Sequence, residues 1–308
     1  MILTYYKTTN NFGDALNPLI FNHYLPGFFD NNEESIFLGI GTILGLEKGT
    51  SQTKKIIVFS SGYGKGDQFT YGTPPNLDER YEIICLRGPL TAKYFGLNPE
   101  LAISDGALLL KDMPFLPVDK IYNCSYMPHH VSEGMYSGWK KLIESEGIHY
   151  ISPQDDALSV IEQIRKSKRL ITEAMHGAIV ADTFRVPWIP LKTFSHINEF
   201  KWNDWAATVN INIKFHVAKS LFNDKYIQEL LSERIKVTKY KPVGYLASQL
   251  YKVARQSQRR KYFIRELRLL KNSKPFLSQE VVLNEKVGLL KEKIRLLQRK
   301  YSINTIYN

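Results

Sequence analysis

The sequence has very few cysteines, with only Cys85 and Cys124 among its 308 residues. Both lie inside apolar runs that are typical of buried strands, where a free cysteine behaves as a small hydrophobic residue. Two isolated cysteines exclude a disulfide framework and a cysteine-rich metal site. We therefore expect a protein of a reducing compartment, the cytoplasm.

Long hydrophobic runs are also missing. No stretch approaches the roughly 20 apolar residues that cross a bilayer. Met1 leads directly into the strand-like residues 2–6, without the basic and apolar regions of an export signal. The patterns GxGxxG and GxxxxGKS/T do not occur, so nothing supports nucleotide binding through such loops. We expect a cytoplasmic protein without a transmembrane segment.

Positive charge is concentrated at one end of the chain, whose formal net charge is +11. Residues 218–308 carry 21 Lys and Arg against 7 Asp and Glu, a net +14, whereas residues 1–217 hold 20 against 23, a net −3. Because the body is near neutral, we expect no nucleic-acid partner. The cationic tail points to an anionic surface or partner.

Short apolar, β-branched runs alternate with helix-length segments along residues 1–217. This alternation predicts an α/β fold with parallel sheets. The runs resume after a loop containing Pro114 and Pro117, which predicts two Rossmann-like domains, residues 1–115 and 116–217. The expected strands are residues 2–6, 36–40, 55–60, 81–86, 101–104, 121–127, 148–151, 169–172, 186–191 and 211–215. The expected helices between them are residues 17–24, 90–95, 137–146, 155–166 and 178–184.

From residue 218 onward the sequence predicts a basic helical tail, with helices over residues 218–235, 243–270 and 277–301. Residues 255–271 interleave Arg and Lys with apolar side chains, which fits a helix lying on an anionic membrane surface. The same helices could equally pack on the core or pair with another subunit. The last one carries an apolar stripe at spacings of four and three: Leu283, Val287, Leu290, Ile294, Leu297 and Tyr301.

In open α/β sheets, ligands bind beyond the carboxyl ends of the strands, so the residues after each expected strand are the first candidates for a site. Glycines and small hydroxyl residues there let backbone amides approach an anion. Each of them could equally form only a tight turn. These residues are Gly13, Gly39, Gly41 and the run from Ser60 to Gly64, which includes Ser61 and Gly62.

His176 follows one of these strands and stands where the helix expected at residues 178–184 begins. Imidazole titrates near neutral pH, which suits proton transfer, and Glu173 is a nearby acid that could hold the ring protonated. The competing interpretation is a histidine that is only packed at a helix start.

Three further positions carry polar groups at strand ends. Arg87 precedes Gly88-Pro89, so its guanidinium could bind a carboxylate or phosphate, or only form a surface ion pair. Asp14 could be a general base or only a helix N-cap, and its position before a helix favours the cap. His129 and His130 could line a cleft from the second domain. Because no Cys, Asp or Glu stands at ligand spacing from them, we expect no metal site.

Seven stretches follow one another along the chain: NNFGDALNP (10–18), GIGTIL (39–44), FSSGYG (59–64), LRGPLTA (86–92), SDGALLL (104–110), MPHH (127–130) and ITEAMHGAIVAD (171–182). In this order they resemble the polysaccharide pyruvyl transferase family. The resemblance covers about residues 1–215. Its most specific parts are Asn11-Phe12-Gly13-Asp14, Arg87-Gly88 and the stretch from Glu173 to Gly177.

The resemblance implies a two-domain fold like the GT-B glycosyltransferases and a phosphoenolpyruvate donor. Its pyruvyl group would move onto two hydroxyls of a sugar as a cyclic ketal, with no metal or organic cofactor. The implied catalytic residues are His176, Arg87 and Asp14. The implied donor-binding residues are Met175, Gly177, Glu173, Ser61, Gly62 and Lys65, and the implied acceptor-binding residues are Asn11, Gly13, His129 and His130.

One departure from the family pattern affects the donor site. The family often has Arg or Ser beside Leu-His, and Ala174-Met175 stand there in this sequence. The change leaves one donor cation unassigned, with Lys65 or Arg185 as substitutes.

The expected partners are phosphoenolpyruvate and a sugar of a polysaccharide or of its lipid-linked precursor. The basic tail would add peripheral contact with the inner face of the membrane. Two alternatives remain open at this point. One is a GT-B-type glycosyltransferase that uses a nucleotide sugar. The other is a non-catalytic scaffold of polysaccharide synthesis.

Overall fold

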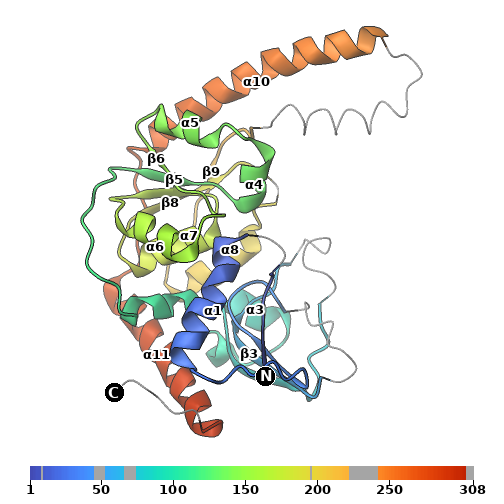
Figure 1. The fold of residues 1–308 in the computed structure, drawn as a ribbon, viewed down its shortest axis with the longest axis vertical. Helices are drawn as coiled ribbons and strands as arrows, with labels where there is room; N and C mark the ends of the chain where they lie inside the picture. The colour runs from blue at the N-terminus through green and yellow to red at the C-terminus, as the bar shows by residue number, and fades with distance from the viewer. Residues whose placement is uncertain (8–9, 45–52, 66–73, 195, 222–241, 303–308) are drawn as a thin grey trace.

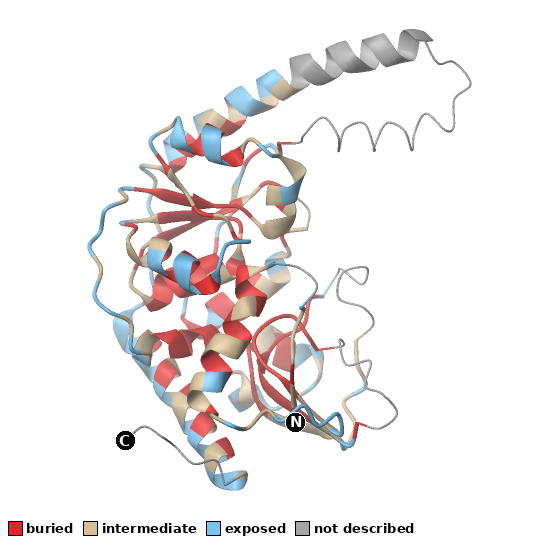
Figure 2. Ribbon diagram, viewed as in Figure 1, coloured by how far each residue is buried: buried red, intermediate tan, exposed pale blue. Residues whose placement is uncertain are grey.

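The computed structural model describes residues 1–308 apart from 8–9, 45–52, 66–73, 195, 222–241 and 303–308. The described chain forms two parallel β-sheets, one from each half, with helices packed around them (Figure 1). The strands of both sheets are largely buried (Figure 2). Their continuous apolar sequences follow from this, because a parallel sheet is covered on both faces. The predicted α/β class with parallel sheets is confirmed.

The first sheet has four strands in the order β1-β2-β3-β4. They are β1 (Ile2–Thr4), β2 (Ser35–Leu38), β3 (Lys55–Ser61) and β4 (Tyr81–Leu86). Helix α1 (Phe12–Tyr24) connects β1 to β2, and α3 (Pro89–Tyr94) follows β4.

The strand expected at residues 101–104 is wrong. The chain forms instead two 3₁₀ helices, η1 (Pro99–Leu101) and η2 (Gly106–Asp112), with a single bridge between Leu86 and Ala102. Asn98 and Asp105 cap the two helices through their side chains, which draws the backbone away from the sheet.

The second sheet has five strands in the order β6-β5-β7-β8-β9. They are β5 (Ser125–Met127), β6 (His149–Tyr150), β7 (Leu170–Thr172), β8 (Trp188–Lys192) and β9 (His216–Val217), so the last strand lies just beyond the expected 211–215. The strand order reverses between β5 and β7, and a ligand crevice opens at such a point. The helices of this half are α4 (His130–Met135), α5 (Trp139–Glu144), α6 (Ala157–Arg165), α7 (Met175–Thr183) and α8 (Glu199–Thr208).

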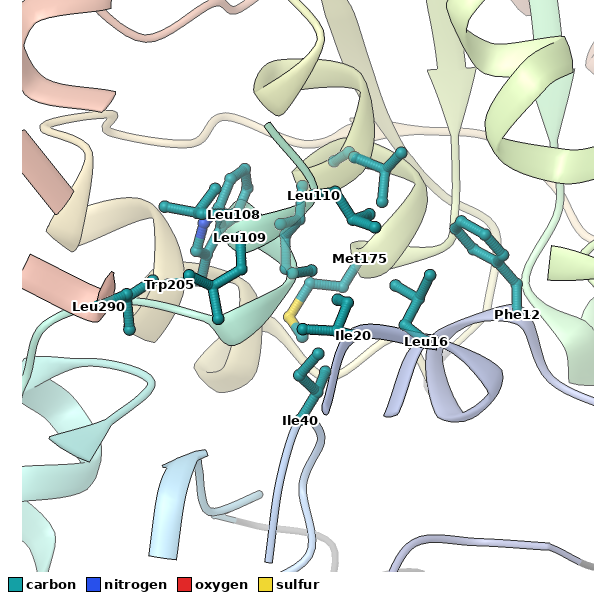
Figure 3. Packing of buried hydrophobic residues seen from close by; sticks show 14 of the residues in the cluster. Phe12, Leu16, Ile20, Ile40, Leu108, Leu109, Leu110, Met175, Trp205 and Leu290 are labelled. Atoms are coloured by element: carbon teal, nitrogen blue, oxygen red, sulfur yellow. The ribbon is translucent and has the colours of Figure 1, made fainter. Parts of the chain in front are cut away.

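One apolar core runs through both halves (Figure 3). Its members include Leu16 of α1, Leu109 of η2, Met175 of α7, Trp205 of α8 and Leu290 near the C-terminus. The predicted boundary near residue 115 falls in the segment after η2, whose residues 116–121 are mostly exposed. Because the core is continuous, side chains of both halves pack directly against each other around the site.

The two C-terminal helices are α10 (Pro242–Leu270) and α11 (Glu280–Lys300). In α11, the apolar stripe from Leu283 to Leu297 is buried in the core, and Lys291 and Lys300 form ion pairs with Asp112 and Glu82 of the first half. Packing on the core, one of the two alternatives for the stripe, is thus confirmed. The helix expected at residues 218–235 lies largely outside the described residues.

The end of α10 packs on the second half of the chain. Phe263, Leu267 and Leu270 are buried beside Trp139, and Arg268 forms an ion pair with Glu146. These apolar side chains, expected to face a membrane, are therefore covered by protein. Among the helices of the described residues, none combines the length and apolar character needed to cross a bilayer.

Candidate functional site

A cavity of about 310 Å³ lies at the carboxyl ends of strands from both sheets. Its walls come from the start of α1, the loop after β2, the turn from β5 into α4, the start of α7, and the segment around the start of α8. The lining residues are Tyr6, Asn11, Phe12, Gly13, Asp14, Gly41, Thr42, Met127, His129, His130, Val131, Ala174, Met175, His176, His196 and Lys201.

The start of α1 presents Asp14 to the cavity. The side chain of Asn11 caps the helix by accepting from the amide of Gly13, and its own amide group donates to Asp14 Oδ2 at 2.7 Å. The cap is therefore Asn11, and the expectation that Asp14 is the N-cap is wrong. Burial raises the pKa of Asp14, while the charges of His176 and Lys201 and the bond from Asn11 oppose that rise.

Asn17 fixes this end of α1 to the first sheet. Its side-chain carbonyl accepts from the amide of Ile40, and its amide donates to the carbonyl of the same residue. These two hydrogen bonds satisfy the backbone of Ile40, which lies just beyond β2. They hold Asp14 in a set position relative to the sheet.

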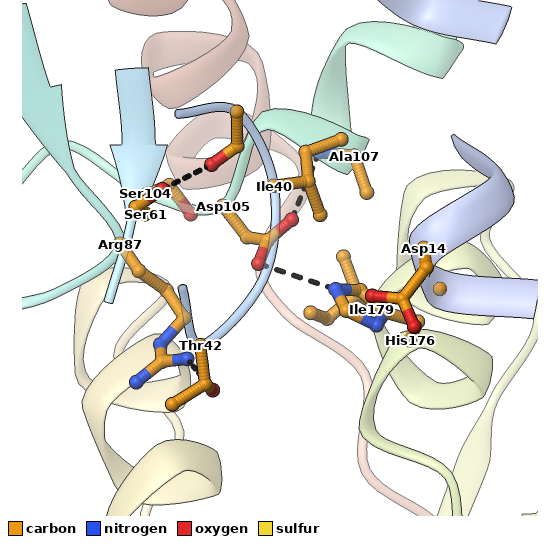
Figure 4. Close-up of polar contacts among 12 residues, drawn as sticks. Asp14, Ile40, Thr42, Ser61, Arg87, Ser104, Asp105, Ala107, His176 and Ile179 are labelled. Carbon is orange, nitrogen blue, oxygen red and sulfur yellow. Dashed lines mark hydrogen bonds and ion pairs between the residues drawn. The ribbon is translucent and has the colours of Figure 1, made fainter. Parts of the chain in front are cut away.

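His176 is the second residue of α7, whose N-cap is Ala174. Its ring lies against the backbone of Gly13, where an added Cβ atom would stand 2.0 Å from Nδ1. On its other side, Nε2 is 3.6 Å from Oδ2 of Asp105 (Figure 4). Neither of these two atoms has a hydrogen-bond partner among the described residues. The ring is thus held between Gly13 and a buried carboxylate.

Asp105 is a site residue that the sequence prediction missed. It is fully buried, and its other oxygen accepts from the amide of Ala107 at 2.9 Å, which caps η2. The signal for it was its place after the fifth expected strand in Ser104-Asp105-Gly106. Because it was interpreted only as part of a motif, its approach to His176 remained hidden.

Glu173 forms no ion pair with His176 among the described residues, so the expectation that it holds the ring protonated is wrong. Its two oxygens accept from the hydroxyls of Tyr126 and Ser132, and the amide of His129 also donates to it. It is fully buried, and burial raises the pKa of this carboxyl group. Glu173 therefore supports the turn that carries His129 and His130.

Arg87 lies behind the cavity wall. It is fully buried and donates to Asp204 at 3.0 Å, to the hydroxyl of Thr42 at 2.9 Å and to the carbonyl of Tyr63 at 2.7 Å. Gly62 lies flat against the guanidinium, so an added Cβ atom there would be 2.3 Å from Cζ. Arg87 thus reaches the site through Thr42, which does line it.

Of the remaining predicted donor residues, Met175 lines the cavity, and Gly177 and Ser61 are not among its lining residues. Gly177 lets α7 approach Met127 and Thr172 closely. Ser61 donates to the carbonyl of Gly39 from a buried position.

Neither suggested substitute cation belongs to the cavity lining. Lys65 lies over the ring of Tyr94, with its Nζ 5.9 Å from the ring centroid. Arg185 donates to Ser278, near the start of α11.

Another part of the cavity lining consists of His129, His130, His196 and Lys201. Burial lowers the pKa of His129 well below the ordinary range and that of His130 to about 4, and the charge of Lys201 lowers both further. His129 and His130 are thus neutral at pH 7. His196 and Lys201 were missed because they follow β8 in a stretch without a recognisable motif.

In the described part of the chain, no group of three or more His, Cys, Asp or Glu side chains is arranged to hold a metal ion.

Comparison with known proteins adds two findings. A family model described as polysaccharide pyruvyl transferase matches residues 50–195. The succinoglycan biosynthesis protein ExoV of Rhizobium meliloti (strain 1021) is 40% identical over 208 residues, which cover 66% of this chain and 63% of that protein. This chain belongs to the polysaccharide pyruvyl transferase family. It spans less than two thirds of the length of its curated relative.

The family match and the cavity overlap only in part. Arg87, Asp105, His129 and His176 all lie within the matched residues 50–195. The start of α1, with Asn11 and Asp14, and the start of α8, with Lys201, lie outside them. Part of the cavity wall is thus formed by residues outside the stretch that the family model matches.

Proposed function

We propose that this protein transfers the pyruvyl group of phosphoenolpyruvate onto two hydroxyls of a sugar, in a polysaccharide or its lipid-linked precursor. The product would be a cyclic ketal. The observation that carries the proposal is the cavity that His176, at the start of α7, lines together with Asp14 of α1. Asp105 lies behind the ring of His176. Family membership supports this reaction class.

The start of α7 offers a place for the donor's anionic groups. The first amide groups of a helix have no partner within the helix, and they carry a partial positive charge. Here the N-cap is Ala174, which supplies no side-chain cap, so the amides at Met175 and His176 are left for a ligand. Both residues line the cavity.

His176 is the proposed acid. The reaction requires a proton on the methylene carbon of phosphoenolpyruvate, which leaves an oxocarbenium ion at the neighbouring carbon. The carboxylate of Asp105, 3.6 Å from Nε2, would orient the imidazole ring for this proton transfer. Asp105 would therefore act as a positioning residue for the acid.

Asp14 is the proposed base. A sugar hydroxyl attacks the cation and gives its proton to Asp14. The phosphate then leaves with this proton as hydrogen phosphate. The second hydroxyl closes the ring on the new cation, and its proton restores the acid form of His176. Asp14 lies across the ring of His176 from Asp105 (Figure 4). Its raised pKa makes it a stronger base than an exposed aspartate. Asn11 and Gly13 would contact the acceptor beside it.

We also propose a GT-B-like arrangement of the two sheets around this cavity. For the tail, the exposed cations Arg260, Lys261 and Arg265 of α10 would attract the anionic membrane surface that holds a lipid-linked acceptor. Because Phe263, Leu267 and Leu270 are buried and Leu269 is the exposed leucine of this segment, such contact would be mainly electrostatic. The proposed reaction needs no cofactor besides the donor.

The test is incubation with phosphoenolpyruvate and a panel of synthetic and lipid-linked glycosides. Released phosphate is measured, and the added pyruvyl group is detected by mass. We expect activity with phosphoenolpyruvate and none with nucleotide sugars. His176→Ala should remove activity while the circular dichroism spectrum stays unchanged. Full activity in this variant would contradict the proposal.

A further inference from the structure

Helix α8 belongs to the second half in sequence, yet it docks on the first half. It packs against α3, and its side chains Trp202, Trp205 and Ala206 are buried in the common core. Two charged residues one turn apart on this helix have different surroundings. Lys201 lines the cavity, and Asp204 is fully buried.

Asp204 holds α8 to the first half through hydrogen bonds to Arg87 and Thr91. It accepts from Arg87 Nε at 3.0 Å, from the amide of Thr91 at 2.9 Å and from the hydroxyl of Thr91 at 2.6 Å. The backbone of α8 also lies against Gly88, where an added Cβ atom would be 1.9 Å from the carbonyl oxygen of Asp204. Any side chain at residue 88 would push the helix away.

These contacts explain the residue order Arg87-Gly88-Pro89-Leu90-Thr91. Arg87, Gly88 and Thr91 together form a receptor for Asp204. A fully buried carboxylate is costly unless it is paired and hydrogen-bonded, so α8 occupies this one position. The backbone of Lys201, one turn before Asp204, is therefore fixed relative to the first half.

Lys201 brings a fixed positive charge into the cavity. Of the described lining residues, the other basic side chains are histidines, and no arginine is among them. Two of those histidines, His129 and His130, are neutral at pH 7. A phosphate dianion can therefore pair with the ammonium group of Lys201 in the same cavity that the start of α7 lines.

We infer that Lys201 binds the phosphate of the donor, and that Arg87 is a positioning residue that acts on Lys201 through Asp204. The inference deepens the proposed function and rests on it for the identity of the donor. It supplies the donor cation that Ala174 leaves unassigned. It also replaces the expected direct contact between Arg87 and the donor.

The test measures binding of phosphoenolpyruvate and of inorganic phosphate by calorimetry. Lys201→Met should weaken both by about tenfold or more, because a charge-assisted hydrogen bond is lost. Lys201→Arg, which keeps the charge, should bind nearly as well as the wild type. Lys214→Met, an exposed lysine of the same half outside the cavity, is the matched control and should bind normally.

A second variant separates positioning from direct contact. Asp204→Asn, or Thr91→Val where the first does not fold, should weaken donor binding by itself. The effect of Lys201→Met should then largely disappear in that background, because both changes remove the same contact. If the fold-losses of donor affinity in the two single variants instead multiply in the double variant, Arg87 and its partners act independently of Lys201. The positioning role is then wrong.

The outcomes also separate this inference from the proposed function. Wild-type-like binding of both ligands by Lys201→Met would overturn the inference alone. Absence of phosphoenolpyruvate binding by folded wild-type protein would refute the donor. Binding of inorganic phosphate that depends on Lys201 would still support the phosphate subsite in that case, and its absence would remove it.

Discussion

The imidazole of His176 lies directly on the backbone of Gly13, with room for no atom between them. An added Cβ atom at Gly13 would stand 2.0 Å from Nδ1 and 2.8 Å from Cε1 of the ring. Contacts of this length do not occur between carbon and nitrogen, so the two halves of the chain meet here at van der Waals distance. The position of the proposed acid thus depends on the absence of a side chain in α1.

Gly13→Ala should therefore displace His176 and remove most activity. We expect kcat to fall by at least about tenfold, because the displaced ring would lose its alignment with the donor. The fold should persist, since the ring can rotate toward the cavity. Steady-state kinetics and circular dichroism check this.

Gly288→Ala is the matched control for this variant. Gly288 lies on α11 with open space around its Cα, so alanine should fit there and raise the free energy of unfolding by about 0.5–1 kcal/mol. Its activity should stay at the wild-type level. Normal kcat in Gly13→Ala would mean that the ring position does not matter.

Asp105→Asn should lower kcat while binding of phosphoenolpyruvate is kept. The amide preserves the shape of the side chain and its cap on Ala107, but it removes the carboxylate charge that faces Nε2 of His176. A fall in kcat of about ten- to a hundredfold is expected for a partner that orients a catalytic group. The comparison is Asp112→Asn at the other end of η2, where Asp112 pairs with Lys291 outside the cavity. Equal kcat in both variants would show that Asp105 does not assist His176.

His130 should make the protein less stable in acid. Burial lowers its pKa in the folded state to about 4, below the ordinary value of 6.5. Between these two values the unfolded chain binds the proton more readily, so stability from this group is lost as pH falls from 6.5 toward 4. The proton titration of the imidazole, followed by NMR, should show a midpoint near 4.

The variant His130→Asn isolates this contribution. It cannot bind the proton in either state, so its free energy of unfolding should decline less than that of the wild type between pH 6.5 and pH 4.5. Urea unfolding at several pH values measures the difference. Parallel declines of the two proteins would show that His130 does not carry the effect.

The Arg87–Asp204 pair should be costly to break. Arg87→Met leaves Asp204 buried without its countercharge, which typically costs about 3–5 kcal/mol of unfolding free energy. The double variant Arg87→Met with Asp204→Leu should lose less than the two single variants added together. Chemical denaturation gives these values. Lys54→Met, which breaks an exposed pair with Glu34, should change little.

The exposed cations of α10 should bind anionic vesicles in a salt-dependent way. We expect the full-length protein to sediment with vesicles that contain phosphatidylserine at low salt and to dissociate as salt screens the attraction. Arg260→Glu with Lys261→Glu should weaken this binding. Lys214→Glu, an exposed charge change elsewhere, should have less effect. Equal binding to uncharged vesicles would rule out an electrostatic contact.

Much of the fold could be predicted because its signals are local. The strands at residues 55–61 and 81–86 and the helix at residues 157–165 follow from apolar periodicity and from caps that act within a few residues. The wrong strand prediction at residues 101–104 also arose from local signals. Capping by Asn98 and Asp105 was a local alternative that the apolar pattern concealed.

The sequence by itself determined the α/β class and brought most cavity residues into view, including Asn11, Asp14, His130 and His176. They could be found because each follows a strand, and the carboxyl ends of parallel strands meet at one edge of a sheet. The motif order then identified the family.

Only the tertiary structure decided which of these groups touch. Arg87 and Asp204 are 117 residues apart, and their pairing turns an expected donor contact into a buried support for α8. The carboxylate beside His176 is Asp105 and not its sequence neighbour Glu173, and Lys201 enters the cavity without any motif. The reason is physical. Periodicity and capping act over a few residues, whereas the pairing of a buried charge depends on which distant segment packs against it.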